Sequence, residues 1–267
     1  MRSLLLLFNF LFFYCNAQQI TGIVTDSETG KALPFVNIGF VNRGIGTVSD
    51  FNGNYALDIS KAKHSDSLKF SYLGYKSYAI ARKDIKNNEL HVRLEPSAIV
   101  LEEAVVTNKP WKHKKAGYYT QTENTTCGFQ TNEKGNEAGV KIKIKKPSYI
   151  DSVMFNVVKN PFDSIVLRIN LYEIDEQGLP RKNLLPENLF VTLKGQKKYY
   201  SVSLKKYRIR RDKDFIIALE WIESKDATSI MFSCDITGSG IYFRKTSQAA
   251  WEKIPLVSMG LAAHIRY

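Results

Sequence analysis

Hydrophobic and polar residues alternate in short runs along most of this chain, with a period of two residues. The clearest runs are Gly139–Lys145, Ile165–Tyr172 and Phe215–Trp221. Successive side chains of a β-strand point to opposite faces, so each run presents one apolar and one polar face. Weaker versions of the pattern predict further strands at Gln19–Thr25, Val36–Phe40, Thr47–Ser49, Tyr55–Ile59, Leu68–Tyr72, Ser77–Ala81, Glu89–Leu94, Ile230–Cys234, Ile241–Arg244 and Met259–Tyr267. The chain is therefore predicted to be all-β.

The first seven predicted strands are separated by turns rich in Asp, Asn and Gly. Asp26–Gly30 and Asp50–Gly53 are the strongest of these turns, because their residues accept the backbone angles that tight connections need. Short strands joined in this way are typical of a small antiparallel sandwich. We expect residues 18–96 to form such a unit.

Three strings within this unit carry a family resemblance. They are ITGIVTDSETGKALPFVNI at 20–38, GTVSDFNGNY at 46–55 and LKFSYLGY at 68–75. They resemble the carboxypeptidase-like regulatory domain, a transthyretin-like module of exported proteins in Bacteroidetes-type bacteria. The resemblance implies a seven-stranded Greek-key sandwich and a place outside the cytoplasm, but it names no ligand.

A second resemblance follows at Leu101–Thr107, which is similar to the segment after this module in SusC-like TonB-dependent receptors. In those receptors a plug and a membrane barrel of about 22 strands come next, and each strand needs about 10 residues. Only 150 residues lie beyond residue 117 here, so we expect the shared module alone. Residues 97–117 are predicted to be a linker, and 118–267 a jelly-roll-like β-sandwich domain.

Residues 1–17 have the pattern of a secretory signal peptide. Arg2 precedes an apolar run from Leu4 to Tyr14, and Ala17 ends a small-residue cleavage site. The alternative is a lipoprotein signal with Cys15 acylated, which the bulky Tyr14 disfavours. No other apolar run is long enough for a helix to cross a membrane, so we expect no transmembrane segment in the mature chain.

The chain carries a formal net charge of +12, and the surplus belongs to its second half. Residues 101–267 hold 27 Lys and Arg against 18 Asp and Glu. The candidate basic surface consists of Lys141, Lys143, Lys145, Lys205, Lys206, Arg208 and Arg210. Such a surface attracts anionic partners, here an anionic glycan or an acidic envelope protein. The alternative is a solvated strand face that keeps the domain soluble and blocks edge pairing. Export argues against nucleic acid as a partner.

Two further sets of residues are candidates for specific roles. Tyr199, Tyr200 and Trp251 could stack on sugar rings as an aromatic platform, although strands also use aromatic side chains in their own core. Cys127 and Cys234 can form a disulfide in an exported chain, or they can be two separate small hydrophobic residues.

No catalytic pattern emerges from the remaining residues. The four histidines, His64, His91, His113 and His264, are scattered, and none has a Glu three residues on, so neither a zinc site nor any other metal site is expected. A Gly-x-Ser-x-Gly nucleophile motif is also absent from the sequence. We therefore expect no catalytic residue and no cofactor.

The sequence thus favours a non-enzymatic, exported binding or assembly protein of the bacterial cell envelope. It would be periplasmic, associated with the outer membrane or secreted, with the first domain as a docking unit. The alternative is a carbohydrate-binding accessory protein of a glycan-utilisation system, or a hydrolase of such a system whose site is assembled from scattered residues.

The alternation at 139–145 predicts opposite effects for neighbouring substitutions. Replacing Lys141, Lys143 and Lys145 together with Glu should preserve the fold, because exposed substitutions usually change stability by less than about 0.5 kcal/mol each. Ile142→Asp should unfold the domain, since it buries an unpaired charge. Urea unfolding followed by tryptophan fluorescence measures both variants, and an unfolded triple variant would refute the assignment of faces.

Overall fold

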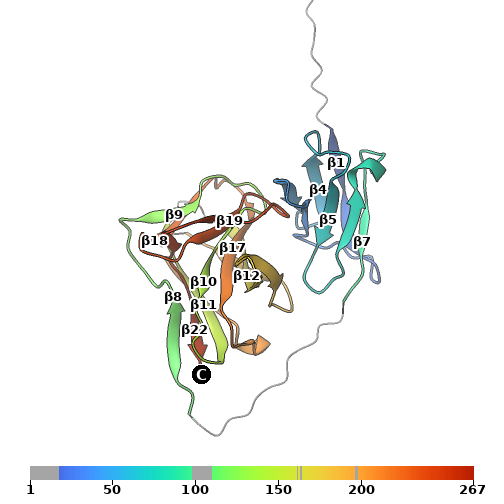
Figure 1. Ribbon diagram of the computed structural model, residues 1–267. Coiled ribbons are helices and arrows are strands. Elements are labelled where there is room, and N and C mark those ends of the chain that lie inside the picture. The colour runs from blue at the N-terminus through green and yellow to red at the C-terminus, as the bar shows by residue number, and fades with distance from the viewer. Residues whose placement is uncertain (1–17, 98–109, 161, 163, 196–197) are drawn as a thin grey trace, which may run out of the picture.

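The computed structural model describes residues 18–97, 110–160, 162, 164–195 and 198–267, and its ribbon is drawn in Figure 1. Strands make up nearly all of its regular structure, which confirms the all-β prediction; the only helical segments within these residues are two 3₁₀ turns, η1 (Arg82–Asp84) and η2 (Lys205–Tyr207). The predicted signal peptide and the receptor-like segment Leu101–Thr107 lie outside the described residues. None of the helices in the described part is long and apolar enough to span a membrane.

The first domain is a sandwich of two small sheets, with the seven strands that the sequence predicts. One sheet has the order β4-β1-β7 and the other β3-β2-β5-β6. The strands are β1 (Gln19–Asp26), β2 (Asn37–Phe40), β3 (Ile45–Val48), β4 (Asn54–Asp58), β5 (Ser67–Ser71), β6 (Tyr78–Ala81) and β7 (Val92–Leu94). Alternate side chains of both sheets, such as Ile20, Ile38, Leu57 and Phe70, fill the core between them. The alternation read from the sequence therefore sets which faces meet.

The second domain is a larger sandwich. Its seven-stranded sheet has the order β13-β12-β17-β10-β19-β20, with β14 also pairing with β12. The strands of this sheet are β10 (Glu137–Ile142), β12 (Ile165–Ile174), β13 (Pro180–Asn183), β14 (Leu189–Leu193), β17 (Phe215–Ser224), β19 (Ile241–Arg244) and β20 (Glu252–Ile254).

The facing eight-stranded sheet has the order β21-β18-β11-β22-β8, with β15 and β16 pairing with β11 and β9 pairing with β18. Its strands are β8 (His113–Gly117), β9 (Thr126–Phe129), β11 (Ser148–Lys159), β15 (Tyr199–Ser203), β16 (Arg210–Arg211), β18 (Ile230–Asp235), β21 (Ser258–Met259) and β22 (Leu261–Arg266). The predicted apolar faces of β12 and β17, from Ile165 to Leu171 and from Phe215 to Trp221, lie in the core between the sheets.

The structure differs from the predicted linker at its C-terminal end. Residues 113–117 were expected to belong to a connector, but they form β8 and pair with β22. β8 is the last strand of its sheet, and Ala116 is its only buried side chain. An edge strand with one small inward residue carries no apolar alternation, so the sequence pattern could not reveal it.

The sequence also predicts that each strand of the second domain has one buried and one solvent-exposed face. This prediction is wrong for β12 and β17. On β17 the outward residues Ile216, Ala218, Glu220 and Ile222 have no exposed surface, just as the inward ones have none. The first domain and the loop before β20 cover part of this outer face, beside β12 in Figure 1. The covered part of the outer face, along β12 and β17, is thus a second interior.

The domain interface combines one apolar cluster with several polar contacts. Phe35 and Val48 of the first domain pack with Ile222 and with the partly buried Val166 and Phe190 of the second. The rings of Phe35 and Phe190 meet edge to face with centroids 5.1 Å apart. Around this cluster, the 247–248 loop bonds to the first domain through Ser247 Oγ to Asn37 Oδ1 (3.1 Å), Gln248 Nε2 to Ser71 Oγ (2.8 Å) and the amide of Asn42 to the carbonyl of Gln248 (2.8 Å).

Two paired glycines allow this loop to approach. Gly39 and Gly46 lie opposite each other on β2 and β3. A Cβ on either would lie 2.3 Å from the carbonyl oxygen of Ser247, well inside van der Waals contact. Only residues without a side chain permit this approach of backbone to backbone.

Gly46→Ala should therefore separate the domains while each keeps its fold. The added methyl collides with the Ser247 carbonyl, whereas Val41→Ala on the same hairpin is exposed and serves as the control. Small-angle X-ray scattering should give a larger radius of gyration for Gly46→Ala, with unchanged circular dichroism. We call the space left by Gly39 and Gly46 the glycine notch. Scattering identical to that of the wild type would mean that the 247–248 loop adapts to the added methyl and that the glycine notch does not control docking of the domains.

Candidate functional site

Four charged residues form one row across the outer face of the seven-stranded sheet. In the strand register Arg168 lies opposite Glu220, Glu220 opposite Glu137, and Glu137 opposite Arg244. All four are buried, with at most 9% of the residue exposed. Buried charges persist only where partners replace the lost water, so the row must be internally paired.

Each carboxylate of the row has both a cation and an amide as partners. Glu137 Oε2 accepts hydrogen bonds from Arg244 Nε (2.8 Å) and lies 2.6 Å from its Nη2, while Oε1 accepts from Asn170 Nδ2 (2.7 Å) and Tyr172 OH (3.0 Å). Glu220 Oε2 accepts from the same Asn170 amide at 3.0 Å and lies 3.4 Å from Arg168 Nη1. Two positive and two negative charges therefore balance within the sheet.

Burial has a direct effect on the proton affinity of Glu137. It raises the pKa of this carboxyl above its usual range; the guanidinium of Arg244 opposes the rise, and neighbouring Glu220 adds to it. On the far side of Arg244, the ring of Trp251 lies 4.9 Å from the guanidinium and also contacts Tyr172. Trp251 thus covers one side of the Arg244 end of the row.

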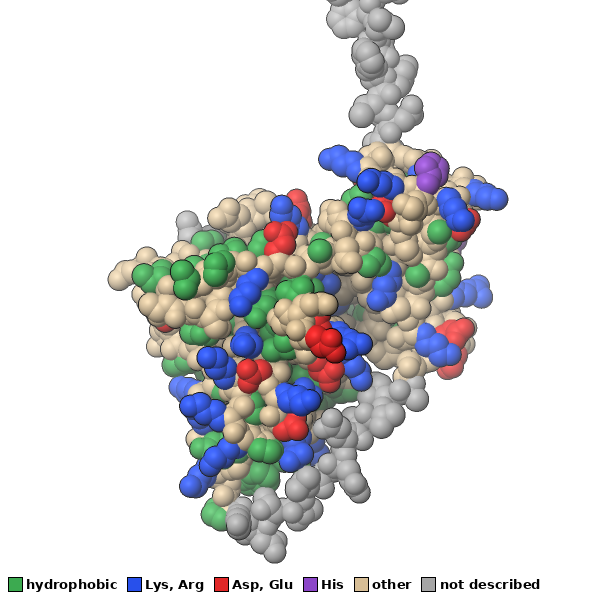
Figure 2. Space-filling model, in the orientation of Figure 1, with side chains coloured by type: hydrophobic (Ala, Val, Ile, Leu, Met, Phe, Trp, Pro, Cys, Tyr) green, Lys and Arg blue, Asp and Glu red, His purple; other side chains and the backbone are tan. Residues whose placement is uncertain are grey.

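A cavity of about 290 Å³ lies over part of the row, between the two domains. The surface is hollowed where the domains meet (Figure 2). The polar residues that line it are Asn37, Lys69, Ser71, Tyr72, Tyr75 and Ser77 from the first domain and Arg168, Asn170, Tyr172, Arg181, Asn183, Asn188, Arg244 and Gln248 from the second. The lining has four cationic side chains and no carboxylate, and Lys69 and Arg181 form no ion pair within the described residues. The cavity is therefore electropositive.

Two polar atoms at this cavity have no hydrogen-bond partner in the described structure. They are Arg168 Nε, on a side chain that is 2% exposed, and Asn188 Oδ1. The other end of the Arg168 guanidinium donates from Nη2 to the carbonyl oxygen of Phe35, across the domain boundary. Buried polar groups are rarely left unpaired, so these two atoms distinguish the cavity wall from ordinary protein interior.

The predicted basic surface is mostly exposed, away from this cavity. Lys143, Lys145, Lys205, Lys206, Arg208 and Arg210 are exposed, and Lys141 is partly buried. Two of these lysines are already paired: Lys141 Nζ lies 3.8 Å from Asp214, and Lys206 Nζ donates to Glu187 at 2.7 Å. Figure 2 shows how widely Lys and Arg spread over the visible face of the second domain. A role of this surface in binding remains a prediction.

The predicted aromatic platform is not assembled. Tyr200 is buried and stacks on Phe155 in the core, at 5.2 Å between ring centroids. Tyr199 precedes it on β15 and contacts Tyr119, while Trp251 packs over Arg244 and Tyr172 beside the other sheet. Strand alternation separates Tyr199 from Tyr200, and the sandwich separates both from Trp251, so the three rings share no surface.

Cys127 and Cys234 are free thiols that lie next to each other on paired strands β9 and β18. Burial raises the pKa of the Cys127 thiol, and its interaction with the neighbouring Cys234 thiol raises it further. The tertiary structure therefore brings together two cysteines that are more than 100 positions apart in the sequence. The disulfide between them stays a prediction.

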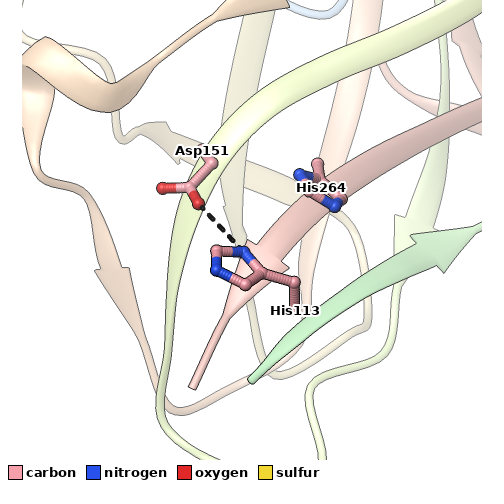
Figure 3. Close-up of side chains that lie close together, drawn as sticks. All are labelled: His113, Asp151 and His264. Atoms are coloured by element: carbon pink, nitrogen blue, oxygen red, sulfur yellow. Dashed lines mark ion pairs between the residues drawn. The ribbon is translucent and has the colours of Figure 1, made fainter. Parts of the chain in front are cut away.

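Two of the four scattered histidines also meet in the fold. His113 of β8 and His264 of β22 stack with ring centroids 5.6 Å apart, beside Asp151 of β11 (Figure 3). Among the described residues, these three side chains form the one cluster of His, Cys, Asp or Glu whose ligand atoms are close enough together to hold a metal ion. The sequence does not predict this cluster, because the three positions are 38 and 113 residues apart in the chain.

The buried charged row was likewise not found by sequence reasoning. Arg168 and Asn170 interrupt an apolar run, and Glu220 interrupts another. Such residues are also what an ordinary wet face of a strand contains. Only the covering domain distinguishes the two cases.

Comparison with known proteins supports the predicted relationship for the first part of the chain. Residues 20–106 match the family model of the CarboxypepD_reg-like domain, which confirms the resemblance. The chain is 33% identical over 140 residues to TonB-dependent receptor P3 of Formosa agariphila. This alignment covers 51% of the chain but only 13% of the receptor, so the chain corresponds to a small part of that relative.

Similarity to solved structures is weak. The chain matches a protein of infectious bursal disease virus (Gx strain) with a TM-score of 0.25 and 11% identity, over 93% of this chain and 62% of the viral one. It matches BcpA, the major pilin subunit of Bacillus cereus, with a TM-score of 0.20 and 13% identity, over 90% and 68% of the two chains. TM-scores of this size establish no shared fold.

The pairing within the row predicts a non-additive pair of substitutions. Arg244→Leu should lower the free energy of unfolding by about 3–5 kcal/mol, because it leaves the Glu137 charge buried without its cation. The double variant Arg244→Leu/Glu137→Leu should lose less, since no unpaired charge remains. Urea unfolding measures both, and Lys76→Leu, which breaks the exposed pair with Glu95, should have a much smaller effect. A double variant that loses more stability than Arg244→Leu alone would contradict the pairing.

Proposed function

We propose that this protein is an exported, non-enzymatic binding protein of the bacterial cell envelope, which holds an acidic saccharide in the cavity between its two domains. The envelope setting is supported by the CarboxypepD_reg-like domain and by the similarity to a TonB-dependent receptor. The signal-like residues 1–17 agree with export. The binding role is supported by the cavity itself.

The observation that carries the proposal is the charge of the cavity wall. Arg168 and Arg244 are neutralised from beneath by Glu220 and Glu137, but Lys69 and Arg181 have no such partner in the described structure. One of these two free cations comes from each domain. A carboxylate or sulfate group between them would gain from both charges in a partly desolvated site, where screening by salt is reduced.

The remaining lining favours a hydroxylated ligand. Amide and hydroxyl side chains, such as those of Asn37, Asn188, Gln248 and Ser71, can each donate or accept hydrogen bonds. Small-molecule sites usually measure about 300–1,000 Å³, and the 290 Å³ of this cavity is just below that range, which limits it to a small ligand. One or two residues of an acidic sugar chain fit this description better than a lipid or a large cofactor does.

In this proposal the first domain acts as a docking unit that completes the site. It contributes Lys69 and Tyr72 to one wall, and its Phe35 carbonyl orients the guanidinium of Arg168 on the other. A cavity built from two domains also depends on their contact, so the glycine notch at Gly39 and Gly46 would indirectly control binding.

The alternative function, a hydrolase, would have to use the two carboxylates beneath the cavity. Glu137 and Glu220 share the amide of Asn170, and a raised pKa is a common property of a general acid. However, neither carboxylate has exposed surface, and each is paired with an arginine. These contacts favour a structural role for both carboxylates. If the protein is instead a hydrolase, incubation with an acidic oligosaccharide should release new reducing ends.

The proposed site predicts a charge-dependent affinity. An oligogalacturonate should bind the protein in isothermal titration calorimetry, and a neutral galacto-oligosaccharide of the same length should bind much more weakly. The double variant Lys69→Gln/Arg181→Gln should lose at least about tenfold in affinity, since charged hydrogen bonds contribute about 1.5–3 kcal/mol each. Affinity should also fall as salt is raised.

The matched control is Lys141→Gln/Lys143→Gln/Lys145→Gln, which removes charge from the separate basic surface. It should bind the acidic oligosaccharide as the wild type does. If this control loses affinity while Lys69→Gln/Arg181→Gln keeps it, the binding surface is the exposed one and the cavity proposal is wrong.

A further inference from the structure

His113, Asp151 and His264 lie on three neighbouring strands of the eight-stranded sheet. The order β11-β22-β8 places His264 of the middle strand between the other two. His264 is opposite Lys115 on β8 and opposite Ser152 on β11, while His113 is opposite Arg266. Since positions two apart on a strand share a face, both imidazoles lie on the outer face of the sheet.

A β-bulge brings Asp151 to the same face. The register between β11 and β22 shifts between Ile150 and Ser152, so Asp151 is the extra residue. Ile150 and Val153 both lie in the core, and therefore both intervening residues face outward. Bulges of this kind redirect a side chain, and this one directs the Asp151 carboxylate toward His113 (Figure 3).

The environment of Asp151 is unusual for a carboxylate. The residue is 2% exposed. Its Oδ1 accepts a hydrogen bond from Arg266 Nη1 at 2.7 Å. Among the described residues Oδ2 has no hydrogen-bond partner, and it lies 3.9 Å from Nδ1 of His113. A buried carboxylate oxygen without a donor calls for a cation beside it.

We propose that His113, Asp151 and His264 bind one divalent transition-metal ion, with zinc as the expected ion, and that this ion ties the edge strand β8 to β11. The potential ligand atoms of the three residues all lie within 4.8 Å of one another. Two imidazole nitrogens and one carboxylate oxygen are a common donor set for zinc, which leaves a fourth position for water.

The two neighbouring cations, Arg266 and Lys115, each have other partners. The guanidinium of Arg266 packs against the rings of Trp111 and Tyr149 and fixes Oδ1 of Asp151, which leaves Oδ2 for the metal. Lys115, beside His264 in the sheet, has its Nζ 3.8 Å from the centre of the Tyr119 ring. His113 is half exposed, so an ion can enter from solvent.

The test is a titration of the metal-stripped protein with zinc chloride in isothermal titration calorimetry. One ion per chain should bind, and His113→Ala and His264→Gln should each weaken binding at least tenfold. The matched control is His91→Ala. His91 also has a carboxylate neighbour, Glu89 at 3.1 Å, but it lies outside the cluster, so its loss should leave the affinity unchanged.

Two further measurements keep the proposal testable if a variant folds poorly. Cobalt(II) added to the wild-type protein should give the intense visible bands of a four-coordinate site, and His264→Gln should abolish them. Zinc should slow hydrogen exchange of the β8 amides in the wild type only. The proposal is overturned if the wild type binds no zinc, if His264→Gln binds it as tightly as the wild type, or if zinc leaves exchange of β8 unchanged.

Discussion

The burial of four charges on one sheet face is the constraint on which the rest of this structure depends. Arg168, Glu220, Glu137 and Arg244 lie side by side across four strands, with no more than 9% of any residue exposed. Isolated charges of this kind would cost many kcal/mol to remove from water. At each end of the row an arginine lies next to a glutamate, and Asn170 and Tyr172 donate hydrogen bonds to the carboxylates. Each carboxylate therefore has donors, which makes its burial tolerable.

The row also explains why the two domains belong together. Arg168 points its guanidinium toward the first domain and donates to the Phe35 carbonyl, and the Phe35 ring packs on Phe190 beside it. Phe35 adopts a left-handed backbone conformation (φ 61°), which is rare for a bulky residue and requires support from its surroundings. Interface contacts thus hold a strained residue, cover part of the sheet face and shape the electropositive cavity at the same time.

The eight-stranded sheet also collects polar and charged side chains on its outer face, in this case at its edge. Its edge strand β8 contributes only Ala116 to the core, so apolar packing alone holds it weakly. On the outer face at this edge, the bulge at Asp151 brings its carboxylate next to two imidazoles and the guanidinium of Arg266. In both sheets, charged and polar side chains that cannot be placed in the apolar core lie together on the outer face, on strands that are distant in the sequence.

The sequence by itself determined the class of fold and the inner faces of the strands. Alternation at Ile165–Leu171 and Phe215–Trp221 identified the core correctly, and the Asp/Asn/Gly turns located the seven strands of the first domain. These features are local, since the side-chain period of a strand depends only on its own residues. The resemblance of residues 20–106 to a known family was visible in the same strings.

Tertiary structure alone decided what lies on the outer faces. Glu220 on β17 and Arg168 on β12 have the alternation of solvent-exposed residues, and only the docked first domain makes them interior. The pairing of His113 with His264 depends on strand order, and the position of Asp151 depends on a bulge, neither of which a period-two pattern encodes. Whether a polar face meets water or another domain is a long-range property, so the candidate sites of this protein became visible only in the assembled fold.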